Sequence, residues 1–209
     1  MSGYILMAPS SITSRTTSSS LKLLVVYWAV GIAVGVLALR MELTQLVSGF
    51  SPGHVVSLGI GLLATLVTMV TYDRVSLRGG RSLHIPTLIA FPLLNGLCET
   101  ILFIASFKLG TILAAGFTTQ PLWLFVAGTT TFFAYSGAIH ALFWLKILPP
   151  HLNKSPAVKR TRIVWIIGLV TLSLMWGWLY FAYQDIWSIV ALHVLFDAGM
   201  VYSIRYRLT

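Results

Sequence analysis

Residues 163–183 of the chain read IVWIIGLVTLSLMWGWLYFAY, and residues 186–204 read IWSIVALHVLFDAGMVYSI. Only Gln184 and Asp185 separate these two apolar runs. An α-helix rises about 1.5 Å per residue, so each run is long enough to cross the roughly 30 Å hydrocarbon core of a bilayer. The stretch therefore predicts two transmembrane helices joined by a very short turn.

Four further apolar runs precede this pair, at residues 21–39, 55–72, 85–107 and 122–148. The last of the four is so long that its helix either tilts or begins after Leu122. Before it, residues 111–120 are semi-apolar and suggest a short re-entrant or interfacial piece. Charged residues make up 9% of the chain, against about 25% in soluble domains. We therefore predict an all-α, polytopic integral membrane bundle of about six helices.

The first twenty residues differ from the rest in composition. Nine Ser or Thr residues lie between Ser10 and Ser20, and no acidic residue precedes Glu42. We interpret residues 1–20 as a cytoplasmic tail and residues 21–209 as one transmembrane domain. An organellar targeting sequence is the alternative, because such sequences are rich in Ser and poor in acids.

The net charge of +9 comes from basic residues that lie between the apolar runs. With six spans, twelve of the fourteen Lys and Arg residues fall on one side, and only Arg40 and Lys108 on the other. The twelve are Arg15, Lys22, Arg74, Arg78, Arg81, Lys146, Lys154, Lys159, Arg160, Arg162, Arg205 and Arg207. Since cytoplasmic loops carry an excess of Lys and Arg, both termini are predicted to be cytoplasmic. This placement favours lipid headgroups, and not nucleic acid, as the partner of the positive charge.

Two smaller patterns concern packing. Five aromatic residues near Gln184 and Asp185 suggest an aromatic belt at the opposite membrane face: Trp176, Trp178, Tyr180, Tyr183 and Trp187. Gly31 and Gly35 form a pair of small residues that lets helices approach closely, either inside the bundle or in a homodimer.

Four ionisable residues lie well inside the predicted spans: Glu99, His140, His193 and Asp197. Such residues cost several kcal/mol in lipid by most estimates and are usually buried and functional. His193 and Asp197 are four residues apart and share a helix face, as do Asn95 and Glu99, and Ser136 and His140. We expect the three polar stripes to converge on one cavity, where they serve either chemistry or structural contacts between helices.

Two chemistries use this set of residues. A carboxylate and an imidazole can activate water for attack on an amide while a second donor holds the oxyanion. Alternatively, two imidazoles and two carboxylates can ligate zinc, manganese or iron. The sequence lacks the His-Glu-x-x-His spacing of helical zinc proteases, so we predict no metal and no other cofactor. His54, His84 and His151 fall in predicted loops and are weaker candidates.

The segments 99–105, 136–140 and 193–197, in this order, resemble the CPBP family of intramembrane proteases. This family includes type II CAAX prenyl endopeptidases and bacteriocin-processing or bacteriocin-immunity proteins. Its first motif, roughly Glu-Glu-x-x-Phe-Arg-Gly after a Pro-containing stretch, corresponds here to ETILFIA after Pro92. Its second, Phe-x-x-x-His, corresponds to SGAIH, and its third, His-x-x-x-Asn, corresponds to HVLFD.

The resemblance implies an intramembrane endopeptidase acting on a membrane-associated protein or peptide. Glu99 would activate water with His140, while His193 and Asp197 would stabilise the oxyanion. The chain departs from the motifs at Thr100 and Ile104, which replace an acid and a base, and at Asp197, which replaces Asn. These departures leave an alternative, a proteolytically inactive scaffold or regulator that binds a partner protein, a lipid or a pigment.

Overall fold

The computed structural model describes residues 18–45, 49–78, 80–148 and 151–208. Of the predicted tail, residues 1–17 lie outside this range. The helices are α1 (Ser18–Ala38), α2 (Arg40–Thr44), α3 (Pro52–Val75), α4 (Ile85–Ala115), α5 (Pro121–Ile139), the π-helix η1 (His140–Trp144), α6 (Leu145–Ile147), the 3-10 helix η2 (Pro156–Val158), α7 (Lys159–Tyr183) and α8 (Ile186–Ile204).

Six stretches of the described chain are long and apolar enough to cross a membrane, which confirms the predicted polytopic helical bundle. They are Ser20–Ala38, Pro52–Val75, Ile85–Ala115, Pro121–Ile147, Pro156–Tyr183 and Ile186–Ile204. Many Leu, Ile and Val side chains on these helices face outward. An apolar exterior of this kind suits contact with lipid chains, so the protein is an integral multi-pass membrane protein.

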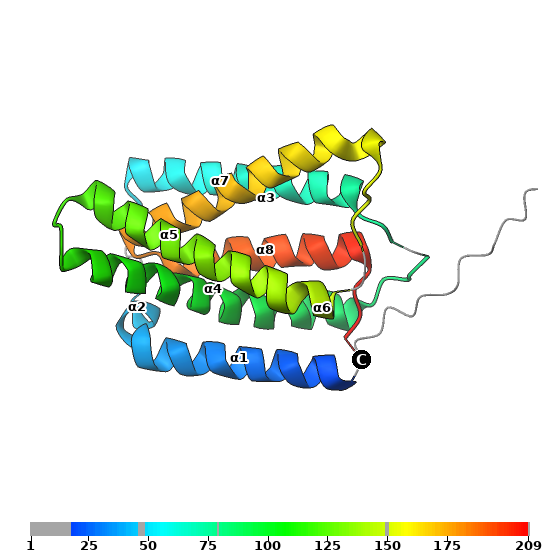
Figure 1. The fold of residues 1–209 in the computed structure, drawn as a ribbon, viewed down its shortest axis with the longest axis horizontal. Helices are drawn as coiled ribbons and strands as arrows, with labels where there is room; N and C mark the ends of the chain where they lie inside the picture. Colours follow the sequence, from blue (N-terminus) through cyan, green and yellow to red (C-terminus); the bar gives the residue numbers. More distant parts are fainter. Residues whose placement is uncertain (1–17, 46–48, 79, 149–150, 209) are drawn as a thin grey trace, which may run out of the picture.

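The structure extends α4 beyond its predicted end and decides between the two alternatives for α5. α4 continues through residues 111–115 to Ala115, so this part of the predicted interfacial piece is regular helix. No proline lies between Phe107 and the end of α4 at Ala115. Gly110 is tolerated inside the helix because it lies where α4 packs against α5. α5 begins at Pro121, not after Leu122, and Figure 1 shows it crossing α4 and α8 obliquely.

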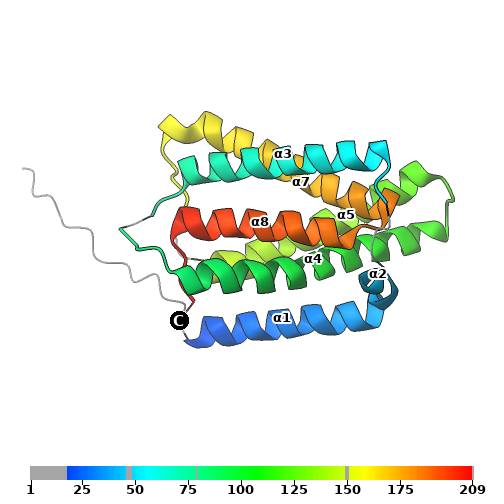
Figure 2. The ribbon, with the colours of Figure 1, turned by 180° about the vertical axis from the view of Figure 1, so that it is seen from behind.

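α4 is the central helix of the bundle. It contacts α1 on one side, α5 on a second and α8 on a third, and α8 in turn contacts α3. α7 packs along α3. Figure 2 shows α8 between α3 and α4, with α1 on the far side of α4. A polar residue on the inner face of α4 or α8 is therefore surrounded by protein.

Two helices begin at side chains that cap them. Ser51 accepts a hydrogen bond from the backbone N–H of His54 at 3.2 Å, and Pro52 begins α3. Asp185 accepts one from the backbone N–H of Ser188 at 3.0 Å at the start of α8. Such caps satisfy N–H groups that have no partner within the helix.

The glycines of α1 serve packing inside the bundle. A Cβ atom at Gly31 would lie 2.8 Å from the backbone oxygen of Cys98 on α4. At Gly35 it would lie 3.2 Å from Ile101. α1 therefore approaches α4 so closely that a larger residue at position 31 would force the two helices apart.

The predicted aromatic belt is wrong for two of its members. Trp176 and Tyr180 are buried in the core, because they face α4 and not the outside of the bundle. Trp178 and Trp187 are exposed, each at 40%, in keeping with the prediction. Tyr183 is half-buried against the ring of His54.

The loops with most of the basic residues lie at one end of the bundle. The start of α1, the segments around residues 76–84 and 151–158, and the end of α8 share that end, while α2 and the turns around residues 116–120 and 184–185 share the other (Figure 1). The predicted orientation depends on this grouping of the basic loops at one end of the bundle. That the basic end is cytoplasmic stays a prediction.

Candidate functional site

Glu99 lies on α4 with 3% of its surface exposed. Three side chains donate hydrogen bonds to its carboxylate. The Tyr27 hydroxyl lies 3.1 Å and Trp144 Nε1 2.8 Å from Oε1, while Asn95 Nδ2 lies 2.9 Å from Oε2. The carboxylate is thus fixed from α1, η1 and its own helix, as a buried charge requires.

Asn95 joins this carboxylate to that of Asp197. Its Nδ2 also lies 2.8 Å from Oδ2 of Asp197 on α8, and its Oδ1 accepts a hydrogen bond from Trp28 Nε1 at 3.2 Å. One amide therefore bridges two carboxylates on different helices and is itself oriented by α1.

His193 lies one turn before Asp197 on the same face of α8, as the spacing predicted. Its Nε2 is 3.5 Å from Oε2 of Glu99 and 3.7 Å from Oδ1 of Asp197. The imidazole is stacked on Phe103, with ring centroids 5.8 Å apart, and lies against Trp176 at 4.6 Å. The two aromatic rings hold the imidazole in one plane, with Nε2 directed at both carboxylates.

Close contact between α4 and α8 makes this arrangement possible. A Cβ atom at Gly96 would lie 2.9 Å from the backbone nitrogen of Val194. Only glycine allows the two backbones to approach this closely. Glu99 on α4 and His193 on α8 each lie within one turn of this contact, which explains the short distance between them.

His140 is less closely associated with the other three residues. It lines the same cavity but is exposed, and in the described part of the chain it makes no direct hydrogen bond to Glu99, His193 or Asp197. Its Nδ1 lies 2.8 Å from the backbone oxygen of Ser136. Because a carbonyl only accepts, Nδ1 carries the proton and Nε2 of the neutral ring has the lone pair.

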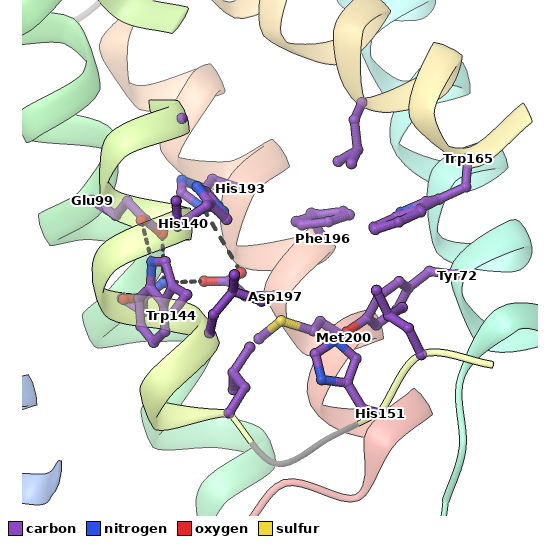
Figure 3. A pocket seen from close by; sticks show the side chains of 17 residues that line it. Tyr72, Glu99, His140, Trp144, His151, Trp165, His193, Phe196, Asp197 and Met200 are labelled. Atoms are coloured by element: carbon purple, nitrogen blue, oxygen red, sulfur yellow. Dashed lines mark hydrogen bonds and ion pairs between the residues drawn. The ribbon is translucent and has the colours of Figure 1, made fainter. Parts of the chain in front are cut away.

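All four predicted residues line one cavity of about 470 Å³ (Figure 3). The rest of its wall is largely apolar and includes Leu145, Leu169, Phe196 and Met200. From the carboxylates the cavity extends toward His151 and Leu152, at the basic end of the bundle. No Lys or Arg of the described segments lines it, so Glu99 and Asp197 dominate its charge.

A second cavity of about 240 Å³ lies between α5 and α7. Phe133 and Ser136 on α5 and Val170 and Ser173 on α7 line it. Both cavities also share part of their wall, namely Gly137, His140, Leu169, His193 and Phe196. The two histidines are therefore reached from both cavities.

One carboxylate oxygen each of Glu99 and Asp197 and one ring nitrogen of His193 lie within 4.8 Å of one another. All three residues are buried. Oxygen and imidazole ligands of this kind suit zinc, manganese or iron. The site residues are thus compatible with a metal ion, although the sequence predicted none.

Several residues of the site are absent from the sequence prediction. Tyr27, Trp28 and Trp144 supply donors, and Thr100 Oγ1 lies 2.9 Å from His193 Nδ1. Their residue types are common in apolar spans, so the sequence alone contains no signal that separates them from packing residues. From the sequence, Thr100 next to Glu99 indicates only the loss of an acid.

The other histidines have separate surroundings. His54 was predicted in a loop, but it lies in the first turn of α3, where its Nε2 is 2.8 Å from Oδ2 of Asp185. Both residues are buried at the end opposite to the basic loops. His84 precedes α4 and bonds Thr87 at 2.8 Å, while His151 lies in the wall of the larger cavity.

Comparison with known proteins provides no family for this chain. No protein-family model, no curated protein and no solved structure matches it.

Proposed function

We propose that the protein is an intramembrane peptidase in which Glu99 activates water for hydrolysis of a peptide bond in a membrane-associated protein. The observation that carries this proposal is the 3.5 Å separation between Glu99 Oε2 and His193 Nε2 at the buried end of a largely apolar cavity. A carboxylate and an imidazole so placed can act on the same reacting atoms. The resemblance of the three sequence segments to CPBP proteases points to the same activity.

The two imidazoles suit different roles. Because His140 donates from Nδ1 to the Ser136 carbonyl, its Nε2 can accept a proton or orient water. His193 directs Nε2 toward two carboxylates, which only accept, so this nitrogen carries a proton and can donate to an oxyanion. One base and one donor in the same cavity as Glu99 are what amide hydrolysis requires.

The reaction then proceeds in two steps. Glu99, assisted by His140, takes a proton from water as the water oxygen bonds to the carbonyl carbon, and His193 Nε2–H donates to the resulting oxyanion. When the tetrahedral intermediate collapses, the C–N bond breaks and Glu99 returns the proton to the leaving nitrogen. The products are a carboxylic acid and an amine, and Glu99 ends as it began.

The cavity between α5 and α7 supports a substrate that enters from the side of the bundle. Its wall includes the exposed side chain of Val170 and the half-buried side chain of Phe133, and it adjoins the larger cavity at His140 and His193. A segment of a membrane-bound protein could reach the two histidines by this route without passing through water.

Variants at Glu99 test the proposal. Membranes from cells that express the wild type, Glu99→Gln or Glu42→Gln at equal levels are compared for the peptide termini of their proteins. Glu42→Gln makes the same chemical change in α2, outside the cavity. We expect termini that appear with the wild type and with Glu42→Gln but not with Glu99→Gln.

Identical termini in all three samples would contradict proteolysis. If a cellular phenotype were then rescued equally by the wild type and by Glu99→Gln, the inactive scaffold or regulator would be the better description. Thermal unfolding of each purified variant must be measured alongside, because the substitution Glu99→Gln presents an amide to Asn95 in place of a carboxylate oxygen.

A metal-dependent membrane enzyme is a second candidate, favoured by the closeness of the Glu99, His193 and Asp197 ligand atoms. A bound zinc ion would lower the pKa of a coordinated water and so generate the nucleophile itself. Elemental analysis of the purified protein separates the two candidates. One metal ion per wild-type chain, lost in both Glu99→Gln and Asp197→Asn, would favour the metal enzyme over the glutamate-based peptidase.

A further inference from the structure

Thr100 follows Glu99 directly on α4, and its hydroxyl contacts the ring of His193. Thr100 Oγ1 and His193 Nδ1 are 2.9 Å apart, and both residues are buried. Because of the close contact of α4 with α8 at Gly96, a side chain as short as threonine spans the distance between the two helices.

The hydroxyl of Thr100 is used differently from those of four other helical threonines in this protein. Thr65, Thr68, Thr71 and Thr130 each donate a hydrogen bond to the carbonyl one turn earlier in their own helix. Within the described residues, the hydroxyl of Thr100 bonds to His193 and to no other group. Its hydrogen is therefore available for Nδ1.

The opposite side of the imidazole favours a proton on Nε2. This atom lies 3.5 Å from Glu99 Oε2 and 3.7 Å from Asp197 Oδ1, and ionised carboxylates only accept hydrogen bonds. A proton on Nδ1 alone would leave a lone pair on Nε2 directed at these oxygens. The tautomer with hydrogen on Nε2 avoids that repulsion and leaves Nδ1 as an acceptor.

We propose that Thr100 is the positioning residue of the site, whose hydroxyl donates to Nδ1 of His193 and so keeps the ring proton on Nε2. Phe103 and Trp176 fix the plane of the ring, while Thr100 and the two carboxylates together set its tautomer. An acidic side chain at position 100 would only accept, and would therefore demand a second proton on the ring. Threonine allows a neutral imidazole to serve as a donor beside two carboxylates.

The consequence for catalysis rests on the proposed function. If His193 Nε2–H stabilises the oxyanion, loss of the correct tautomer removes the donor from part of the molecules. The substitution Thr100→Val, which keeps the shape and removes the hydroxyl, should lower kcat by about ten- to a hundredfold with little change in KM. Thr100→Ser keeps the hydroxyl and should stay close to the wild type.

A spectroscopic test does not require activity. Protein labelled with ¹⁵N-histidine is reconstituted in lipid nanodiscs, and the signals of His193 are identified by their loss in His193→Gln. We expect a protonated Nε2 and an unprotonated Nδ1 in the wild type and in Thr100→Ser. In Thr100→Val the two nitrogens should shift toward an average of the tautomers. Thr65→Val, which removes a buried hydroxyl bonded to its own helix, is the matched control and should leave the His193 signals unchanged.

A proton on Nδ1 in the wild type, or a wild-type spectrum in Thr100→Val, would overturn the proposal. Should Thr100→Val fail to fold, the spectra of the wild type and Thr100→Ser still decide it. Absence of peptidase activity in the wild type would contradict the proposed function instead, and would leave the assignment of the tautomer to the spectra.

Discussion

Asn95 Nδ2 lies 2.8 Å from Oδ2 of Asp197, so an amide on α4 directly binds a carboxylate on α8. The same nitrogen lies 2.9 Å from Oε2 of Glu99. Two buried carboxylates this close together repel each other, and a shared donor reduces that repulsion. The amide is thus the contact that allows both acids to occupy one site.

Asp197 is the residue at which the site fits proteolysis least well, which leads to the first prediction. An ionised Asp197 near His193 Nε2 repels a developing oxyanion, whereas an asparagine there would keep an oxygen for Asn95 and offer an N–H to the oxyanion. Asp197→Asn should therefore raise kcat/KM by the order of tenfold. The measurement is the rate of substrate cleavage at equal protein concentration, once a substrate is known from the peptide termini.

The control for this prediction is Asp73→Asn, which removes a carboxylate paired with Arg78 outside the cavity. It should leave the rate unchanged. Loss of activity in Asp197→Asn, together with loss of a bound metal ion, would show that Asp197 is a ligand and not a hindrance.

The second prediction concerns the pair of His54 and Asp185. These side chains are buried, 2.8 Å apart, and tie the start of α3 to the turn between α7 and α8. Removal of one partner leaves a polar group buried without its bond, at a cost of about 3–5 kcal/mol. We expect His54→Ala to lower stability by about 3 kcal/mol in unfolding measurements in detergent. Asp185→Asn should cost less, because an asparagine amide can still hydrogen-bond the ring of His54.

Asparagine is chosen at position 185 because it also caps helices, so the bond to Ser188 N–H is retained. In a double-mutant cycle the two losses should be far from additive. His84→Ala serves as the control, since His84 is half-buried and should cost less than about 1 kcal/mol. Fully additive losses at positions 54 and 185 would show that the two side chains stabilise the fold independently.

The sequence predicted the helices well because the length of each apolar run alone identifies a transmembrane helix. Six runs long enough to cross the bilayer, each separated by a turn or by basic residues, allow few other folds. The sequence also predicted part of the site, because spacings of four residues place Asn95 beside Glu99 and His193 beside Asp197 on their helices. The rarity of acids and histidines in spans singled out these positions.

The remainder of the site depends on which helices face each other, and the sequence pattern does not predict this pairing of helices. Tyr27 and Trp144 bond Glu99 from α1 and η1, yet aromatic residues in an apolar run look like packing or belt residues. His140 is the first residue of the π-helix η1, and no spacing rule predicts this change of helical geometry. His54 and Asp185 are separated by 131 residues, and no sequence pattern predicts their contact.

The third prediction concerns Glu42, whose carboxylate lies 2.5 Å from Lys108 Nζ. Partial burial would raise the pKa of Glu42, but the hydrogen bond and positive charge of Lys108 outweigh it, so the pKa lies below its ordinary value of 4.5. A carboxylate with a lowered pKa stabilises the fold above the ordinary pKa, and this contribution is lost as the pH falls through the lowered value. Because the pair is partly exposed, its contribution is less than about 1 kcal/mol.

Glu42→Gln should therefore melt slightly below the wild type at neutral pH, and the difference should vanish as the pH falls well below 4.5. Melting temperatures in one detergent across this pH range provide the measurement. A constant difference at every pH would mean that packing or hydrogen bonding of residue 42, and not its charge, stabilises the end of α1.

The fourth prediction concerns orientation, for which two exposed positions are suitable. Asp185 marks the face opposite to the basic loops, but it is buried against His54, so a reporter inserted there would disturb the fold. Thr119 lies in the exposed turn between α4 and α5 at the same end, and Ser82 lies in the exposed segment before α4 at the basic end.

In a Cys98→Ser background, Thr119→Cys should react with a membrane-impermeant maleimide on intact cells. Ser82→Cys should react only after permeabilisation, because the excess of Lys and Arg near it holds that end in the cytoplasm. The reverse labelling would show that the orientation is opposite to the predicted one, and it would not contradict the six-helix bundle. Labelling of both positions on intact cells would place the two loops on one side of the membrane. Since a single span, α4, separates them, that result would contradict the six-helix topology itself.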